Sequence, residues 1–94
     1  MPTNSSPSPT FMAVAVIRDD ADLTELAALR EDEHKRLEML HSDGKIGAHH
    51  VSQARRTVFL EVMAADEKDA AETLATLPFA KFFDLDFYPI PLPV

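Results

Sequence analysis

The 94-residue sequence contains no cysteine and no tryptophan, and it has only two glycines, Gly44 and Gly47. Without cysteine the chain can form no disulfide, no thiolate nucleophile and no cysteine-based metal site. Two isolated glycines do not make the glycine-rich loop that holds phosphate groups in nucleotide-binding proteins. These absences exclude disulfide scaffolds, cysteine enzymes and the common nucleotide-binding motifs.

Positive charge is also scarce, since 9 Lys and Arg residues face 16 Asp and Glu residues and the formal net charge is −7. This balance argues against a nucleic-acid partner and against attachment to anionic membranes, because both need a basic surface. No apolar run approaches the roughly 20 residues of a membrane-spanning helix. Residues 1–10 are rich in Pro and Ser and lack the basic start of a secretory signal. We therefore expect a cytoplasmic protein with a disordered tail over residues 1–10 and one domain over residues 11–94.

Hydrophobic patterning predicts four strands and two helices. The strands are expected over residues 11–17, 46–51, 57–63 and 82–88, and the helices over residues 23–42 and from Asp66 to Pro78. Asp22 is expected to cap the first helix with Glu25 in the capping-box position, and Gly44 to end it in a left-handed conformation. The order β-α-β-β-α-β predicts an α+β, ferredoxin-like fold with a four-stranded antiparallel sheet.

Both faces of this sheet carry apolar side chains. The strand over residues 11–17 is apolar throughout. The strand over residues 57–63 has Val58, Leu60 and Val62 on one face and Phe59 and Met63 on the other. Two helices cover only one face, and the other face would be a large exposed apolar patch on a monomer. We therefore expect a second copy to pack there, giving a dimeric α/β barrel or a larger homo-oligomer.

Residues 72–90 resemble the C-terminal half of the muconolactone isomerase family. That half has a helix ending in Leu-x-x-Leu-Pro, an aromatic pair, and a strand of alternating acidic and apolar residues that closes in Pro-Leu. The matching residues are Leu74, Leu77, Pro78, Phe82, Phe83, Asp84, Asp86, Pro89 and Ile90. Upstream, Leu40, Gly44 and Lys45 look like the family's helix end and glycine-lysine turn. A second resemblance, to the YCII-related group, runs through His34, Leu37, Leu40 and Gly44.

The resemblance implies a dimeric α/β barrel that shifts a proton on an unsaturated lactone from aromatic catabolism, without a cofactor. The family's second strand begins Trp-x-His-x-Trp-Arg, whereas both tryptophans and the arginine are missing from residues 46–51 here. The family's first-strand histidine is missing too, so the fold carries over better than the activity. Two alternatives stay open: a non-catalytic dimerising accessory or ligand-sensing module, and a cofactor-independent monooxygenase on the same fold.

Three polar side chains are candidates for proton transfer to a small carbonyl or lactone ligand. His34 is expected on the apolar side of the first helix, facing the sheet between Leu26 and Leu37, either as the catalytic group or as a hydrogen-bonded structural histidine. Glu61 interrupts an apolar strand, and it is either a general base, a partner for an arginine, or a solvated residue near the sheet edge. His49 is the third candidate.

The doublet His49-His50 cannot hold one metal ion with both imidazoles, because neighbouring strand residues point to opposite faces. With an even number of loop residues, His49 shares a face with Val58 and Leu60; with an odd number, it joins Phe59 and Glu61. No metal-ligand spacing links His34, His49 and Glu61, so we expect no metal. The resemblance to the isomerases implies that no other cofactor is needed.

Arg30, Phe59 and Tyr88 are the candidates for contacts with a substrate. Arg30 either binds an anionic ligand or extends past the core to solvent. Tyr88 either orients a polar ligand through its hydroxyl or packs at an interface. Arg55 and Arg56, at the predicted hairpin tip, either contact a substrate carboxylate, pair with another subunit, or are solvated.

Overall fold

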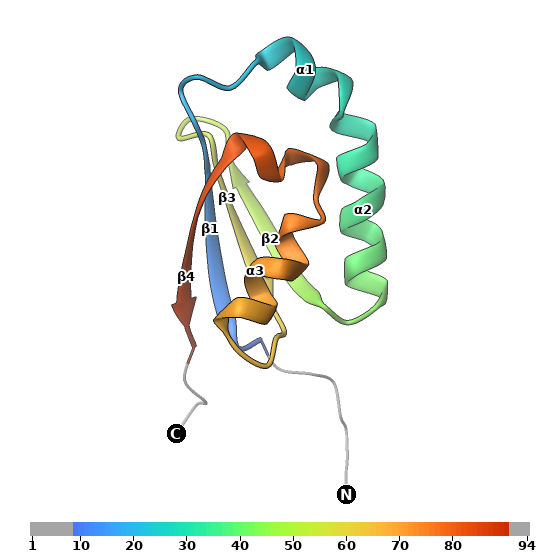
Figure 1. The fold of residues 1–94 in the computed structure, drawn as a ribbon, viewed down its shortest axis with the longest axis vertical. Coiled ribbons are helices and arrows are strands. Elements are labelled where there is room, and N and C mark those ends of the chain that lie inside the picture. Colours follow the sequence, from blue (N-terminus) through green and yellow to red (C-terminus); the bar gives the residue numbers. More distant parts are fainter. Residues whose placement is uncertain (1–8, 91–94) are drawn as a thin grey trace, which may run out of the picture.

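The chain folds into a four-stranded antiparallel sheet with helices over one face (Figure 1). This computed structural model describes residues 9–90. The elements are β1 (Phe11–Ile17), α1 (Leu23–Ala28), α2 (Arg30–Ser42), β2 (Ile46–Ser52), β3 (Thr57–Val62), α3 (Glu67–Ala75), the 3₁₀ helix η1 (Pro78–Phe82) and β4 (Phe83–Pro89). The strand order is β2-β3-β1-β4. This arrangement confirms the predicted α+β, ferredoxin-like fold. Within residues 9–90, none of the helices has the length and apolar character needed to cross a membrane.

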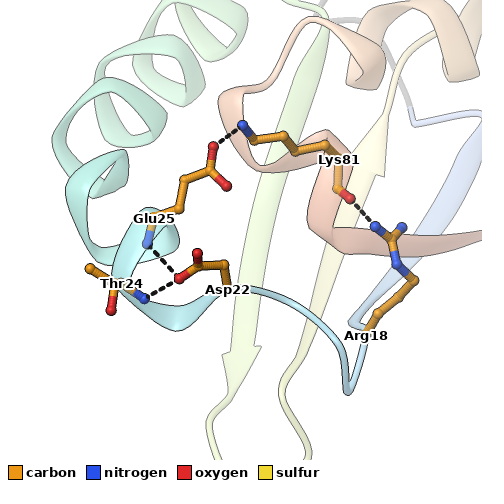
Figure 2. Close-up of polar contacts among 5 residues, drawn as sticks. All are labelled: Arg18, Asp22, Thr24, Glu25 and Lys81. Atoms are coloured by element: carbon orange, nitrogen blue, oxygen red, sulfur yellow. Dashed lines mark hydrogen bonds and ion pairs between the residues drawn. The ribbon is translucent and has the colours of Figure 1, made fainter.

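The prediction of one long helix over residues 23–42 is wrong in one respect, because the helix is divided at Leu29. Leu29 has φ −95° and ψ 0°, and it separates α1 from α2. Asp22 caps α1 as predicted, since its Oδ1 accepts hydrogen bonds from the backbone N–H groups of Thr24 at 3.0 Å and Glu25 at 3.1 Å. The Glu25 side chain does not complete a capping box, and it pairs instead with the ammonium group of Lys81 (Figure 2).

Of the three other predicted helix boundaries, those at Gly44 and Asp66 are confirmed and the one at Pro78 is shifted. Gly44 has φ 72° and ends α2, where the N–H groups of Gly44 and Lys45 donate to the carbonyls of His41 and Leu40. Asp66 caps α3 by accepting a 2.8 Å hydrogen bond from the N–H of Asp69. The helix ends at Ala75 rather than at Pro78, because Pro78 begins η1.

The hydrophobic core lies between the sheet and the helices. Its buried members are Ala13, Ala15, Leu60, Val62 and Phe83 from the strands, Leu40 from α2, Ala70 and Leu74 from α3, and Leu77, with Ile46 at the start of β2. The small alanines of β1 occupy the centre of the sheet, which leaves room for the helices to pack closely against it. Leu40 and Leu74 then anchor α2 and α3 to this face.

The opposite, outer face of the sheet carries the alternate side chains of each strand, which point away from the helices. Register places His50, Phe59, Val14 and Asp86 in one row across the four strands. Met12, Val16 and Tyr88 lie on the same face, and Phe59 and Tyr88 are 38% and 56% exposed. The centre of this face is therefore apolar, whereas its β4 edge is acidic through Asp84 and Asp86.

Both ends of the predicted domain can be compared with the structure only in part. Residues 1–8 of the expected tail, and residues 91–94 of the expected domain, lie outside the described residues. The N–H of Thr10 donates to Val62, and its carbonyl accepts from Ile90, both at 2.9 Å. Sheet hydrogen bonding therefore begins at Thr10, one residue before β1.

Candidate functional site

A cavity of about 420 Å³ lies between the inner face of the sheet and the α1–α2 segment. Most of its lining is apolar and comes from all four strands, α1, α2 and η1. Leu26, Leu37, Val58, Leu60 and Phe79 are among the apolar residues that line it. Four polar side chains also reach it, namely Arg30, Glu33, His49 and Gln53. Ligand sites in proteins have this character: an apolar hollow of a few hundred Å³ with a small number of convergent polar groups.

Glu33 is the most unusual of these polar residues. It lies on the inner side of α2, and only 6% of the residue is exposed. Its Oε1 accepts a 2.9 Å hydrogen bond from the backbone N–H of Phe79 in η1. Burial raises the pKa of the Glu33 carboxyl above its ordinary value of 4.5, and the hydrogen bond from Phe79 offsets part of that rise. The carboxyl is therefore a better base when ionised, and a more available acid near neutral pH, than an ordinary glutamate.

The second oxygen of this carboxyl, Oε2, has no hydrogen-bond partner among the described residues. The hydrogen bond from Phe79 uses only Oε1, and no ion pair joins Glu33 to another residue of the described segment. No enclosed side-chain oxygen or nitrogen within residues 9–90 lacks a hydrogen-bond partner. Oε2 is therefore not fully enclosed by protein, and Glu33 is one of the residues that line the cavity.

Arg30 and His49 complete the polar lining from opposite walls. Arg30 lies one turn before Glu33 on α2, whereas His49 lies on the edge strand β2. His49 pairs with Leu60 across the ladder and therefore shares the inner face, which selects the even-loop alternative because residues 53–56 join β2 to β3. Of the side chains that the sequence suggested, the structure brings these two together at the cavity.

His34 does not face the sheet, and the predicted position of its side chain is wrong. Its imidazole is 73% exposed, and its Nε2 lies 3.7 Å from Oε2 of Glu38 one turn along α2. The inward side of α2 instead carries Glu33, Leu37 and Leu40. His34 lines an open groove beside the cavity, together with His41 and His49.

The remaining candidates lie on the other side of the sheet. Phe59 and Tyr88 belong to the outer face, so the sheet separates them from the cavity. Glu61 accepts a 3.1 Å hydrogen bond through Oε1 from the N–H of Ala48, at an irregularity in the β2–β3 ladder between Ile46 and His49. A Cβ on Gly47 would lie 2.7 Å from the same oxygen, so Glu61 has a structural contact with a glycine-dependent β-bulge.

His34, His49 and Glu61 are therefore not brought together by the fold. Within the part of the chain that the structure describes, no three His, Asp or Glu side chains are arranged to hold a metal ion. Arg55 and Arg56 are exposed at the hairpin tip, where Arg56 has φ 48°. Their side chains are not part of the cavity lining.

The sequence does contain a signal for Glu33, which the interpretation above missed. Glu33 lies about two helical turns after Leu26 and about two before Leu40, with Leu37 one turn beyond it. It therefore occupies the centre of the leucine stripe, whereas His34 lies roughly 100° away from it around the helix. A carboxyl at the centre of an apolar stripe is the costly arrangement that marks a functional candidate.

Polar contacts join η1 to α1 and to Arg18, the residue that follows β1 (Figure 2). The guanidinium of Arg18 donates to the carbonyl of Phe83 at 3.1 Å and to that of Lys81. Lys81 also pairs with Glu25 of α1. These contacts attach η1 to both β1's end and α1, and η1 carries the Phe79 N–H that binds Glu33.

No model of a known protein family matches the sequence, and no curated protein sequence matches it either.

Proposed function

We propose that this chain binds a small, largely apolar carbonyl compound in the cavity and shifts a proton on it without a cofactor, with Glu33 as the proton carrier. An unsaturated lactone is the substrate class that the resemblance to muconolactone isomerases suggests. The observation that carries the proposal is a carboxyl at the cavity wall whose pKa is raised by burial and whose second oxygen is not fully enclosed.

The proposed reaction needs one base that returns the same proton. The ionised Oε2 of Glu33 removes a proton from a carbon adjacent to the conjugated system, and the electron pair moves onto the carbonyl oxygen as a dienolate. The carboxylic acid formed then gives the proton back at the far carbon, and the double bond moves. A raised carboxyl pKa favours this cycle because it brings the base closer in strength to the weakly acidic carbon.

Arg30 and His49 can supply the hydrogen bonds that stabilise the negatively charged dienolate oxygen. Both side chains line the cavity and both can donate hydrogen bonds, and a donor placed where negative charge develops lowers the barrier to proton removal. Apart from Gln53, the remaining lining is apolar, which limits the water that would otherwise compete for the same donors. His34 and Glu61 have no role in this scheme.

Replacing Glu33 with Gln tests the proposal, because Gln has nearly the same shape and can still accept from Phe79. α-Angelica lactone, a β,γ-unsaturated five-membered lactone, is incubated with protein, and its conversion to the conjugated isomer is followed by NMR. The wild type is expected to accelerate this conversion, and Glu33→Gln to lose about 10²–10⁴-fold of that acceleration. Glu38→Gln, an exposed carboxyl on the same helix, serves as control and is expected to retain it. Equal rates for wild type and Glu33→Gln contradict the proposal.

We further propose that the outer face of the sheet binds a second copy of this chain. A domain of this size gains stability from covering the apolar centre formed by Val14, Val16 and Phe59. His50 and Asp86 lie at the two ends of one row. A copy turned about an axis parallel to the strands puts His50 over Asp86 of the partner subunit, whereas a perpendicular axis opposes Asp86 with Asp86 of the partner subunit. The parallel axis is favoured, because an imidazole can donate a hydrogen bond to a carboxylate, whereas two opposed carboxylates repel.

Light scattering coupled to size exclusion measures this assembly. The wild type is expected to elute as a dimer and Phe59→Glu as a monomer, because the substitution places a charge in the apolar centre. Met39→Glu, on an exposed methionine of α2, is the matched control and is expected to stay dimeric. A wild type that is monomeric at micromolar concentration contradicts the proposed interface.

A further inference from the structure

An open groove of about 320 Å³ lies beside the cavity, between α2 and β2. Three of the four histidines in the chain line it, namely His34, His41 and His49. Gly47 and Ala48, which have no side chain beyond Cβ, form its β2 side and leave the space beside the helix unfilled. Of these three imidazoles, the function proposed above uses only that of His49.

The groove and the cavity adjoin at two side chains. Leu37 from α2 and His49 from β2 line both hollows. The two hollows are therefore neighbours, and both lie against α2 and the edge strand β2.

We propose that the cavity and the groove form one elongated binding site, in which an apolar carbonyl-bearing part fills the cavity and an uncharged, hydroxyl-bearing end occupies the groove. This inference rests on the proposed function of the cavity and adds the class of molecule that the cavity receives.

The groove's polar groups select an uncharged end over an anionic one. None of the described residues that line it is a lysine or an arginine, and the carboxylate of Glu38 lies within it. An anionic end would approach this carboxylate without a permanent positive charge to offset the repulsion. A neutral imidazole offers one donor and one acceptor, and so does a hydroxyl group, so the histidines and Ser42 match a hydroxyl-bearing ring.

Saturated γ-lactones test this inference because they bind without reacting. The short probe is γ-valerolactone, and the long probes carry a 4-hydroxyphenethyl or a 4-carboxyphenethyl group in place of its methyl. Calorimetry is expected to show the hydroxyphenethyl lactone binding at least 10-fold more tightly than the short lactone, and the carboxyphenethyl lactone more weakly than the hydroxyphenethyl one. If the hydroxyphenethyl lactone binds no better than the short lactone, the elongated site is wrong while the cavity site stands. If no lactone binds, the cavity proposal fails and this inference fails with it.

Filling the groove provides the second arm of the test. Ser42→Trp places a large ring in the groove and is expected to remove the advantage of the hydroxyphenethyl lactone over the short one. Met39→Trp puts the same ring on α2 outside the groove lining and is expected to keep that advantage. Ala48→Phe fills the groove from β2 and covers the case in which Ser42→Trp misfolds. A retained advantage in a folded groove-filled variant, or equal binding of the two long lactones, overturns the inference.

Discussion

Replacing Glu33 with Gln is expected to make the protein more stable at neutral pH while it removes the proposed activity. The carboxyl is buried and has no cationic partner in the described chain, so its ionised form is poorly solvated. Glutamine avoids this cost, and its Oε1 can still accept the hydrogen bond from Phe79. When a residue serves chemistry at the expense of stability, its replacement raises the free energy of unfolding and lowers activity.

The stability gained by Glu33→Gln over the wild type is expected to increase as pH rises. Burial raises the pKa of Glu33 in the folded protein above 4.5. Below that ordinary value the carboxyl is protonated in both states, and wild type and variant are equally stable. As pH rises toward the folded-state pKa, the unfolded chain releases its proton first, and the wild type loses stability until the folded carboxyl ionises too. Each unit by which the pKa is raised corresponds to about 1.4 kcal/mol, and 1 kcal/mol to roughly 4–8 °C in Tm.

Urea unfolding followed by far-UV circular dichroism measures the difference, since the chain has no tryptophan to report on unfolding. The free-energy gap between Glu33→Gln and wild type is expected to be near zero at about pH 4 and to grow toward about pH 8. Glu38→Gln is the control, because its exposed carboxyl contributes within about 0.5 kcal/mol at any pH. A gap that does not change with pH, or a Glu33→Gln variant less stable than wild type at about pH 8, refutes the reasoning.

Three further changes test local features of the fold by the same unfolding measurement. Gly44→Ala is expected to cost about 1 kcal/mol because φ at this position is 72°, and an unchanged midpoint would show that the turn relaxes freely. Asp66→Ala removes the acceptor for the N–H of Asp69 and is expected to cost about 1 kcal/mol, whereas Asp66→Asn should retain most of the stability. Leu40→Ala is expected to cost roughly 2–5 kcal/mol, since Leu40 is 2% exposed in the core, and a loss under about 1 kcal/mol would contradict its anchoring role.

The order of elements was predictable from sequence because each signal is local. Alternation and apolar runs identified the strands, and Asp22, Asp66 and Gly44 marked helix ends through hydrogen bonds to residues two to four positions away. The break at Leu29 was not predictable in this way. Leucine favours a helix, and no glycine or proline marks the division between α1 and α2.

The site was harder to predict because it depends on contacts between distant segments. Arg30 and His49 were identified, but their meeting at one cavity follows from the register of β2 against β3. Glu33 was missed because the helix stripe was centred on His34, although the leucine spacing alone places Glu33 at its centre. The hydrogen bond between Glu33 and Phe79 joins residues 46 positions apart, and no local pattern reports it.

The contacts around η1 explain how the fold tolerates a carboxyl in an apolar stripe. Pro78 turns the chain so that the Phe79 N–H is available to Glu33, and the Lys81–Glu25 and Arg18–Lys81 contacts attach that turn to α1 and the end of β1 (Figure 2). The donor thus occupies one oxygen of the carboxyl and leaves the other for a ligand. Because the same hydrogen bond both stabilises the ionised form and orients it, loosening η1 from α1 is expected to affect stability and proton transfer together.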